Sequence, residues 1–352
     1  MQLWERQLAA SITAPDELAR HFHLDPEAMQ AVASRYPLRI TPHYLSLIAA
    51  PDDPIGRQCI PDLRELADDL LPDPLAEESL SPVPGLIHRY PDRVVWLVSN
   101  ACAVYCRFCM RKRKVGCGGS TAVAPIDDVL AYLRANTTIR DVILSGGDPL
   151  LLADDTLADI LAGLRAIKHL EIIRINSRVP VTLPSRITPQ LCRMLRRFHP
   201  LYCNTHFNHP REVTPESSRA CARLAEVGIP LGNQTVLLKG VNDEPQVMGE
   251  LLKRLLAIRV KPYYIHQLDL VRGTGHFRTP LAAGLAILNA VRGHTSGLAA
   301  PHYVIDLPGG KGKVPLLPEQ VKWCDDRLEI RTYKGETVSY PLLPGEVRAP
   351  LG

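Results

Sequence analysis

Several features that mark specialised classes of protein are missing from this sequence. No apolar run approaches the ~18–20 residues that a membrane-spanning helix needs. The first residues lack the basic-then-apolar pattern of a secretory signal, and the basic residues form no stripe of the kind that binds nucleic acid. Net charge is only +4 over 352 residues, with acids and bases mixed along the chain. We therefore expect a cytoplasmic protein with neither a nucleic acid nor a membrane as partner.

Internal repeats and low-complexity tracts are also absent, and the chain divides into three parts by its pattern of residues. Residues 1–85 predict a helical region punctuated by proline, with helices that start near Pro15 and Pro26. Residues 86–320 alternate short β-branched runs with helix-length amphipathic segments. We expect residues 321–352 to form a short C-terminal extension.

The middle part predicts parallel strands joined by helices, because its strand candidates are nearly continuous apolar runs. About six βα units predict an α/β fold with a full or partial TIM-like barrel, whose chemistry would lie at the C-terminal ends of the strands. Threonine–proline pairs open three helices, at Thr188, Thr214 and Thr279, where the hydroxyl can cap the helix. Strands are expected at 94–99, 141–145, 172–176, 201–207, 233–238, 261–267 and 303–307, and helices at 126–135, 154–168, 189–198, 215–227, 244–258 and 280–292.

Nine cysteines are many for a chain in a reducing compartment, where clustered cysteines more often serve a metal or catalysis than a disulfide. Cys102, Cys106 and Cys109 directly follow the first strand candidate. This spacing suits a [4Fe–4S] cluster with one iron left open, to which S-adenosylmethionine (SAM) can bind. A zinc site is the alternative, but it usually shows a second cysteine pair, which the sequence lacks. The others are expected to be small buried apolar side chains: Cys59, Cys117, Cys192, Cys203, Cys221 and Cys324.

Glycines and basic residues accompany the cysteines. Ser145, Gly146 and Gly147 end the second strand candidate, where glycine allows close approach of a ligand such as the ammonium group of SAM, or simply a tight turn. Arginines and lysines lie on both sides of the first strand, at 88–93 and 111–114. They are commonly a solvated surface, but their placement favours an anionic ligand, since guanidinium groups bind phosphate and carboxylate by paired hydrogen bonds.

A glycine-rich loop follows the last strand candidate. The strand ends at Asp306, and the loop carries two lysines, Lys311 and Lys313. The pattern is typical either of a flexible surface turn or of a lysine that close-packed backbone delivers into a cleft, as a Schiff-base lysine requires. These residues alone do not distinguish Lys311 from Lys313.

The ordered motifs between His88 and Pro318 resemble the lysine 2,3-aminomutase family of radical SAM enzymes. They include HRYPDRV, CAVYCRFCMRKRK, ILSGGDPLL, NTHFNHPREVTP, PLGNQTVLLKGVND and DLPGGKGKVP. The resemblance implies a partial (β/α)6 radical SAM barrel and an isomerase that converts α-lysine into β-lysine with a [4Fe–4S] cluster, SAM and pyridoxal 5′-phosphate (PLP). More narrowly, the chain is similar to the shorter bacterial branch that makes β-lysine for elongation factor P. That branch implies an elongation factor P ligase as recipient of the product, and a reductant such as flavodoxin or ferredoxin.

The resemblance also implies roles for individual residues that would hold the cofactors. The cluster would be bound by Cys102, Cys106 and Cys109. The residues that would line SAM are Ser145, Gly146, Gly147, His206 and Gln234. PLP would be bound by Lys313, which is seven residues after Asp306, with Arg89, Tyr90 and Arg93 at its phosphate or ring.

Three residues would select the substrate. By resemblance, Arg111 would bind the substrate carboxylate, and Asp269 and Asp306 would bind its ε-ammonium. A buried ammonium needs anionic partners, because an unpaired buried charge is very costly. Glutamate-directed members of the family replace this acidic pair, so lysine is favoured here, with arginine as the nearest competitor.

Other functions stay open. A degradative lysine or arginine 2,3-aminomutase is the closest, although such longer members carry zinc-binding cysteines in a C-terminal tail and this sequence has only Cys324 beyond the lysine loop. A PLP-free radical SAM enzyme that acts on a peptide or RNA is a second alternative. A non-enzymatic iron–sulfur or zinc carrier is a third, which SAM cleavage would exclude.

Overall fold

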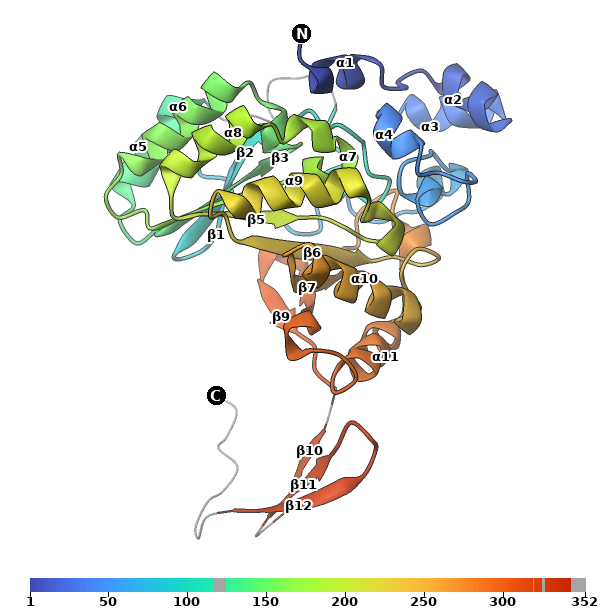
Figure 1. Cartoon of the computed structure of the whole chain (residues 1–352), viewed down its shortest axis with the longest axis vertical. Coiled ribbons are helices and arrows are strands. Elements are labelled where there is room, and N and C mark those ends of the chain that lie inside the picture. The colour runs from blue at the N-terminus through green and yellow to red at the C-terminus, as the bar shows by residue number, and fades with distance from the viewer. Residues whose placement is uncertain (117–124, 319, 325–326, 343–352) are drawn as a thin grey trace.

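A single curved sheet forms the centre of the computed structural model, which describes residues 1–116, 125–318, 320–324 and 327–342 (Figure 1). Its nine strands pair in chain order; β2 to β8 run parallel, and β1 and β9 add an antiparallel strand at each edge. The strands are β1 Leu86–Tyr90, β2 Arg93–Ser99, β3 Asp141–Gly146, β4 Ile172–Asn176, β5 Leu201–Thr205, β6 Leu231–Leu237, β7 Lys261–Gln267, β8 His302–Asp306 and β9 Lys313–Pro315.

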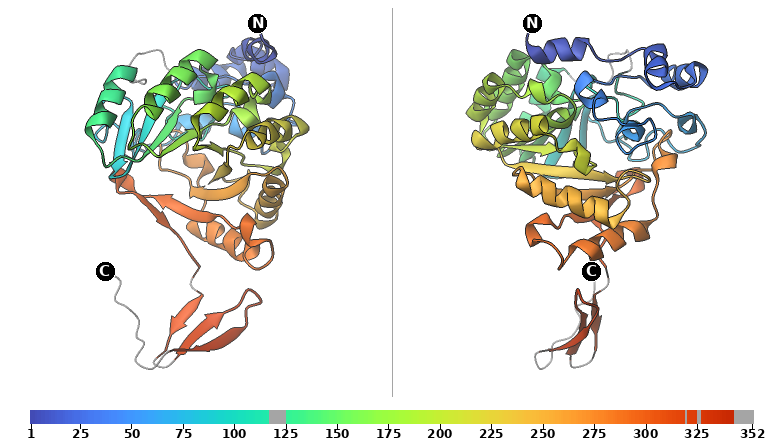
Figure 2. Two further views of the ribbon diagram at one scale, coloured as in Figure 1. Left: turned by 60° about the vertical axis from the view of Figure 1, so that its left-hand side comes forward. Right: turned by 45° about the vertical axis from the view of Figure 1, so that its right-hand side comes forward.

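Helices connect the parallel strands and cover the outer face of the sheet (Figures 1 and 2). One continuous apolar core fills the space between the two layers. The predicted α/β partial barrel is therefore confirmed, because apolar parallel strands alternate with amphipathic helices along the chain. None of the helices in the described ranges is long and apolar enough to cross a bilayer. The connecting helices are α5 Ile126–Ala135, α6 Asp154–Arg165, α7 Val179–Thr182, α8 Pro189–Leu195, α9 Pro215–Glu226, α10 Pro245–Ala257 and α11 Leu281–Val291.

Two of the three predicted threonine caps are confirmed. The hydroxyl of Thr188 accepts from the N–H of Leu191, and that of Thr214 accepts from the N–H of Ser217. The third prediction is wrong, because α11 begins after Pro280 rather than after Thr279. The carbonyl of Thr279 accepts a hydrogen bond of 2.9 Å from Gln267 Nε2 in β7, which holds this residue against the sheet.

The N-terminal region packs on one side of the sheet (Figure 1). Its helices start at Pro15 and Pro26, as expected, because proline suits the first turn of a helix. Side chains of this region reach far into the barrel: Tyr44 donates to Glu212 over 2.7 Å, and both side chains are fully buried. The helices are α1 Leu3–Ala9, α2 Pro15–Phe22, α3 Pro26–Ala33 and α4 Pro42–Leu45, with the 3₁₀ turns η1 Gly56–Gln58 and η2 Leu63–Leu66.

A second, three-stranded antiparallel sheet follows the barrel and stands apart from it (Figure 1). The sequence had predicted only an extension here. The register places six apolar side chains on one face, and the ring of Tyr333 in the β11–β12 turn lies 5.3 Å from that of His294 in the main body. The strands are β10 Val321–Trp323, β11 Arg327–Arg331 and β12 Thr337–Pro341, and the six side chains are Val321, Trp323, Leu328, Ile330, Val338 and Tyr340.

Candidate functional site

A cavity of about 770 Å³ lies on the inner side of the curved sheet, where loops follow the C-terminal ends of several parallel strands. Every residue for which the sequence predicts a role in binding or catalysis lines this cavity. Their roles remain predictions, but their positions make one site. The residues are Arg89, Tyr90, Arg93, Cys102, Cys106, Cys109, Arg111, Ser145, Gly146, Gly147, His206, Gln234, Asp269, Asp306 and Lys313.

The three clustered cysteines present their thiols to the cavity from the loop after β2. Within the described ranges, no three His, Cys, Asp or Glu side chains converge on one metal ion. Thiolates of an iron–sulfur cubane each bind a different iron and so lie further apart, whereas a zinc site gathers its ligands around one ion. Burial raises the pKa of Cys109 to about 11, so its thiolate needs a cationic partner such as iron. The donor set therefore fits a cluster better than zinc.

Three buried charged side chains, which we call the buried triad, hold this cysteine loop in place. Glu65, which is fully buried in the N-terminal region, accepts from Arg107 Nη2 and from Lys112 Nζ, each at 2.5 Å. Burial opposes ionisation of Glu65, but the two cations outweigh it and hold its pKa below the ordinary value. Because Arg107 and Lys112 flank Cys109, the carboxylate holds the loop at both sides of that cysteine.

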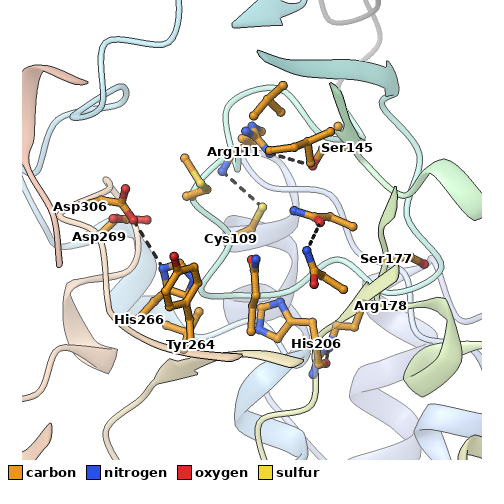
Figure 3. A pocket seen from close by; sticks show the side chains of 18 of the residues that line it. Cys109, Arg111, Ser145, Ser177, Arg178, His206, Tyr264, His266, Asp269 and Asp306 are labelled. Atoms are coloured by element: carbon orange, nitrogen blue, oxygen red, sulfur yellow. Dashed lines mark hydrogen bonds and ion pairs between the residues drawn. The ribbon is translucent and has the colours of Figure 1, made fainter. Parts of the chain in front are cut away.

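Arg178 is a second buried support that the sequence did not reveal. Its Nη1 donates to Cys106 Sγ over 2.7 Å, and its Nη2 donates to Glu212 and to Tyr44. This hydrogen bond ties the Cys106 side chain to an arginine that is itself buried. Figure 3 shows Arg178 on the same side of the cavity as His206.

Among the predicted SAM residues, one ring nitrogen is buried without a hydrogen-bond partner in the described part of the chain. Burial lowers the pKa of His206 to about 3, so its imidazole is neutral, and its Nε2 is buried without a partner among the described residues. An orphaned ring nitrogen that lines a cavity fits a ligand with a complementary polar edge, such as adenine. Gly146 and Gly147 are explained by the protein's own packing rather than by a ligand. A Cβ added at Gly146 would lie 2.2 Å from the carbonyl oxygen of Ser99, and one added at Gly147 would lie 2.3 Å from that of Ala101. Glycine is required here by the chain's own backbone.

The two lysines of the loop differ in position. Lys313 lines the cavity, whereas Lys311 is exposed. The N–H of Lys313 donates to the hydroxyl of Tyr90 over 2.9 Å, and the guanidinium of Arg93 lies 3.8 Å from the centre of the Tyr90 ring. Arg89 Nε is buried without a partner in the described part of the chain. These donors beside a lysine fit the phosphate and the aldehyde of PLP.

Two aspartates meet at the lysine end of the cavity (Figure 3). Asp306 pairs with the ammonium of Lys313 and lies 3.4 Å from Arg89 Nη1. Burial opposes its ionisation, but its bonds with His266 and Lys313 lower the pKa of Asp306. Asp269 behaves in the opposite way, because burial and the charge of Asp306 raise its pKa to about 7.

Arg111 lies on another side of the cavity, beside Ser145 (Figure 3). Its Nη1 donates to Ser145 Oγ over 3.2 Å, and the carboxylate of Glu77 accepts from its Nε and Nη2. Glu77 was not singled out by the sequence, which placed it within the helical region expected at residues 1–85. Local patterns give no signal for such contacts, because Glu77 and Arg111 are distant in the chain.

The scattered cysteines mostly follow expectation. Cys59, Cys192, Cys203 and Cys221 are buried, as predicted for small apolar side chains, whereas Cys324 is only partly buried. Cys117 lies outside the described residues.

Comparison with known proteins gives consistent matches over nearly the whole chain. A radical SAM superfamily profile matches residues 96–252, and a lysine-2,3-aminomutase profile matches residues 288–347. An L-lysine 2,3-aminomutase of Clostridium subterminale is 49% identical over 96% of this chain and 83% of that protein. A glutamate 2,3-aminomutase of Clostridioides difficile is 45% identical over 94% of this chain and 81% of its own length. An L-lysine 2,3-aminomutase of Escherichia coli is 36% identical over 89% of this chain and 94% of that protein.

The buried triad predicts that Glu65→Gln destabilises the protein and its cysteine loop. The variant leaves two buried cations without their anion, which costs about 3–5 kcal/mol in the free energy of unfolding. Urea unfolding measures this loss. The amount of iron bound per chain after reconstitution shows whether the cysteine loop still binds its metal. Glu171→Gln is the control, since it breaks an exposed pair with Arg140 and is expected to change neither measurement. Equal stability of the two variants would contradict the role of Glu65.

Proposed function

The chain belongs to the lysine 2,3-aminomutase family of radical SAM enzymes, an isomerase family, and from this premise we propose that it moves the amino group of free L-lysine from the α-carbon to the β-carbon. Radical SAM enzymes use a [4Fe–4S] cluster and SAM, and the proposal adds PLP as the third cofactor. It also adds elongation factor P as the destination of the β-lysine, passed through a ligase, and a flavodoxin- or ferredoxin-like reductant.

One observation carries the proposal: the three cysteine thiols and Lys313 line a common cavity. Radical chemistry on an amine needs a radical source and an amine-binding cofactor within reach of one substrate molecule. A cluster at the cysteines with SAM would supply the radical, and PLP at Lys313 would supply a conjugated π system through which nitrogen can migrate.

The residues around Lys313 suit it for attack on a carbonyl. His266 Nδ1 lies 3.2 Å from Lys313 Nζ. Burial and the charge of Lys313 lower the pKa of His266, so its imidazole stays neutral and adds no second cation beside Lys313. Tyr90 meanwhile holds the backbone of Lys313 through its hydroxyl.

The charges across the cavity favour lysine as substrate. Arg111 offers a cation for the α-carboxylate, and Asp269 with Asp306 offers two acids for the ε-ammonium. Glutamate would bring a second carboxylate to the acidic pair, which like-charge repulsion disfavours. Arginine keeps the cationic end and is the nearest competitor.

Anaerobic reconstitution tests the activity directly. The purified chain is supplied with iron, sulfide, PLP, SAM, a reductant and L-lysine, and the amino acids are separated by chromatography. β-Lysine is expected, and its formation should require each cofactor. Glutamate and arginine in place of lysine serve as controls, and turnover of glutamate in preference to lysine would overturn the substrate assignment.

The lysine assignment predicts that Lys313→Ala removes the visible absorption of protein-bound PLP. Lys313 lines the cavity and Lys311 is exposed on the same loop, so Lys311→Ala is a matched control that should keep the absorption. Loss of the band in the Lys311 variant with retention in the Lys313 variant would reverse the assignment.

Asp269 predicts a pH dependence for lysine. Because its pKa is raised to about 7, the carboxyl is protonated and neutral below that pH and cannot attract an ammonium. kcat/KM for lysine should therefore rise as pH increases through about 7. Asp269→Asn should remove this rise and lower kcat/KM above it on the order of 100-fold. Asp127→Asn changes an exposed carboxylate on α5 and should keep the wild-type profile.

A further inference from the structure

Arg111 is held along one edge of its guanidinium by Glu77. Arg111 Nε lies 3.0 and 3.1 Å from the two carboxylate oxygens of Glu77, and Arg111 Nη2 lies 2.7 Å from Oε1. Both side chains are largely withdrawn from solvent, with 13% of Arg111 and 2% of Glu77 exposed. Burial opposes ionisation of Glu77, yet the charges of Arg111 and its basic neighbours lower its pKa. The pair is therefore a bidentate contact between ionised groups.

The opposite edge of the guanidinium is left for a ligand. A guanidinium has five N–H groups, and Glu77 and Ser145 accept from three of them in the part of the chain that the structure describes. One N–H remains on each Nη, and the two Nη atoms form the terminal edge of the guanidinium. Two donors on neighbouring nitrogens can serve the two oxygens of a carboxylate.

The segment that carries Glu77 is fastened to the loops around the cavity. We call residues 71–80 the strap. The N–H of Arg272, just after the loop of Asp269, donates to the Leu71 carbonyl over 2.9 Å. The N–H of Gly309, in the lysine loop, donates to the Pro74 carbonyl over 2.8 Å. Since these bonds lie on the N-terminal side of Glu77, they limit how far its carboxylate can move.

In addition to these hydrogen bonds, ion pairs hold the strap. Arg113 Nη2 lies 2.9 Å from Asp73 and 2.9 Å from Glu78, and Lys114 lies 3.1 Å from Glu78. The basic residues after the cysteine loop thus meet the acidic residues of the strap, and Glu77 is the member of the acidic set that is buried and lines the cavity.

We propose that Glu77 is a positioning residue that aims the terminal edge of Arg111 at the α-carboxylate of the substrate. The proposal rests on the proposed function, because it requires that Arg111 binds that carboxylate. Charge alone gives the opposite expectation: Glu77 repels a second carboxylate, so removing its charge would strengthen binding of lysine. If Glu77 positions Arg111, removing its charge weakens binding of lysine instead. A guanidinium released from its partner can rotate away from the bidentate geometry.

The test measures recognition of the carboxylate separately from binding in general. Holoenzyme with PLP and SAM, without reductant, is titrated with L-lysine and with L-lysinamide, and binding is followed by the visible spectrum of PLP. Lysinamide keeps both amino groups but has no carboxylate, so the ratio of the two dissociation constants reports the contact with Arg111. The variants are Glu77→Gln and Glu77→Asp, with Asp127→Asn, which removes an exposed carboxylate on α5, as the control.

Wild type and Asp127→Asn are expected to prefer lysine over lysinamide by the same factor. Glu77→Gln should lose most of this preference, by about 10-fold to 100-fold. Glu77→Asp, which keeps the charge on a shorter side chain, should recover part of it. In an Arg111→Gln background, Glu77→Gln should change the ratio no further, because the two residues act on one contact.

Different outcomes overturn different statements. If Glu77→Gln keeps or increases the preference while wild type prefers lysine, the positioning role is wrong and the proposed function stands. If Glu77→Gln does not load PLP, the Asp variant decides, and a wild-type ratio in that variant refutes the inference. If wild type itself shows no preference for lysine, Arg111 does not bind the carboxylate, and the proposed substrate contact fails together with the inference.

Discussion

The loop that carries the three cysteines depends on one buried carboxylate. Glu65 comes from the N-terminal region and neutralises Arg107 and Lys112, two cations that lie within the loop and have almost no contact with solvent. Such charges would be very costly without an anion between them. The N-terminal region adds further bonds, since Arg39 donates to the Cys102 carbonyl and Arg107 donates to the Pro37 carbonyl. The helical region before the barrel is therefore part of the support of the site.

The charges in the cavity are separated in a way that matches a particular kind of molecule. Arg111 lies near the cysteines and Ser145, whereas Asp269 and Asp306 lie together near Lys313 (Figure 3). An amino acid with a cationic side chain carries the complementary pair of charges at its two ends. A family fold alone does not give this selectivity, because relatives named for lysine and for glutamate share it. In the proposed function, the selectivity comes from Arg111, Asp269 and Asp306.

The sequence predicted most of the fold and the residues that line the cavity, because both leave local signals. Parallel strands appear as apolar runs, and the cysteines, glycines and Lys313 occur as short motifs in loops after them. The supporting contacts leave no such signal. Glu65 and Arg107 are 42 positions apart, Glu77 and Arg111 are 34 apart, and Cys106 and Arg178 are 72 apart. A single charged residue in a polar segment is most often exposed, so burial of Glu77 becomes visible only when the chain is folded.

The ion pair between Lys313 and Asp306 would link the proposed cofactor to the proposed substrate. In the structure the Lys313 ammonium contacts the acid that we propose for the substrate's ε-ammonium, so both cations would use the same carboxylate. A lysine that is covalently bound through its nitrogen to a carbonyl no longer competes as a primary ammonium for Asp306. Asp269, whose pKa is raised to about 7 by burial and by Asp306, would then be the second acid beside the ε-ammonium of the proposed substrate. Because this carboxyl ionises more readily as pH rises through that value, the pair would carry two negative charges for one ammonium only above it.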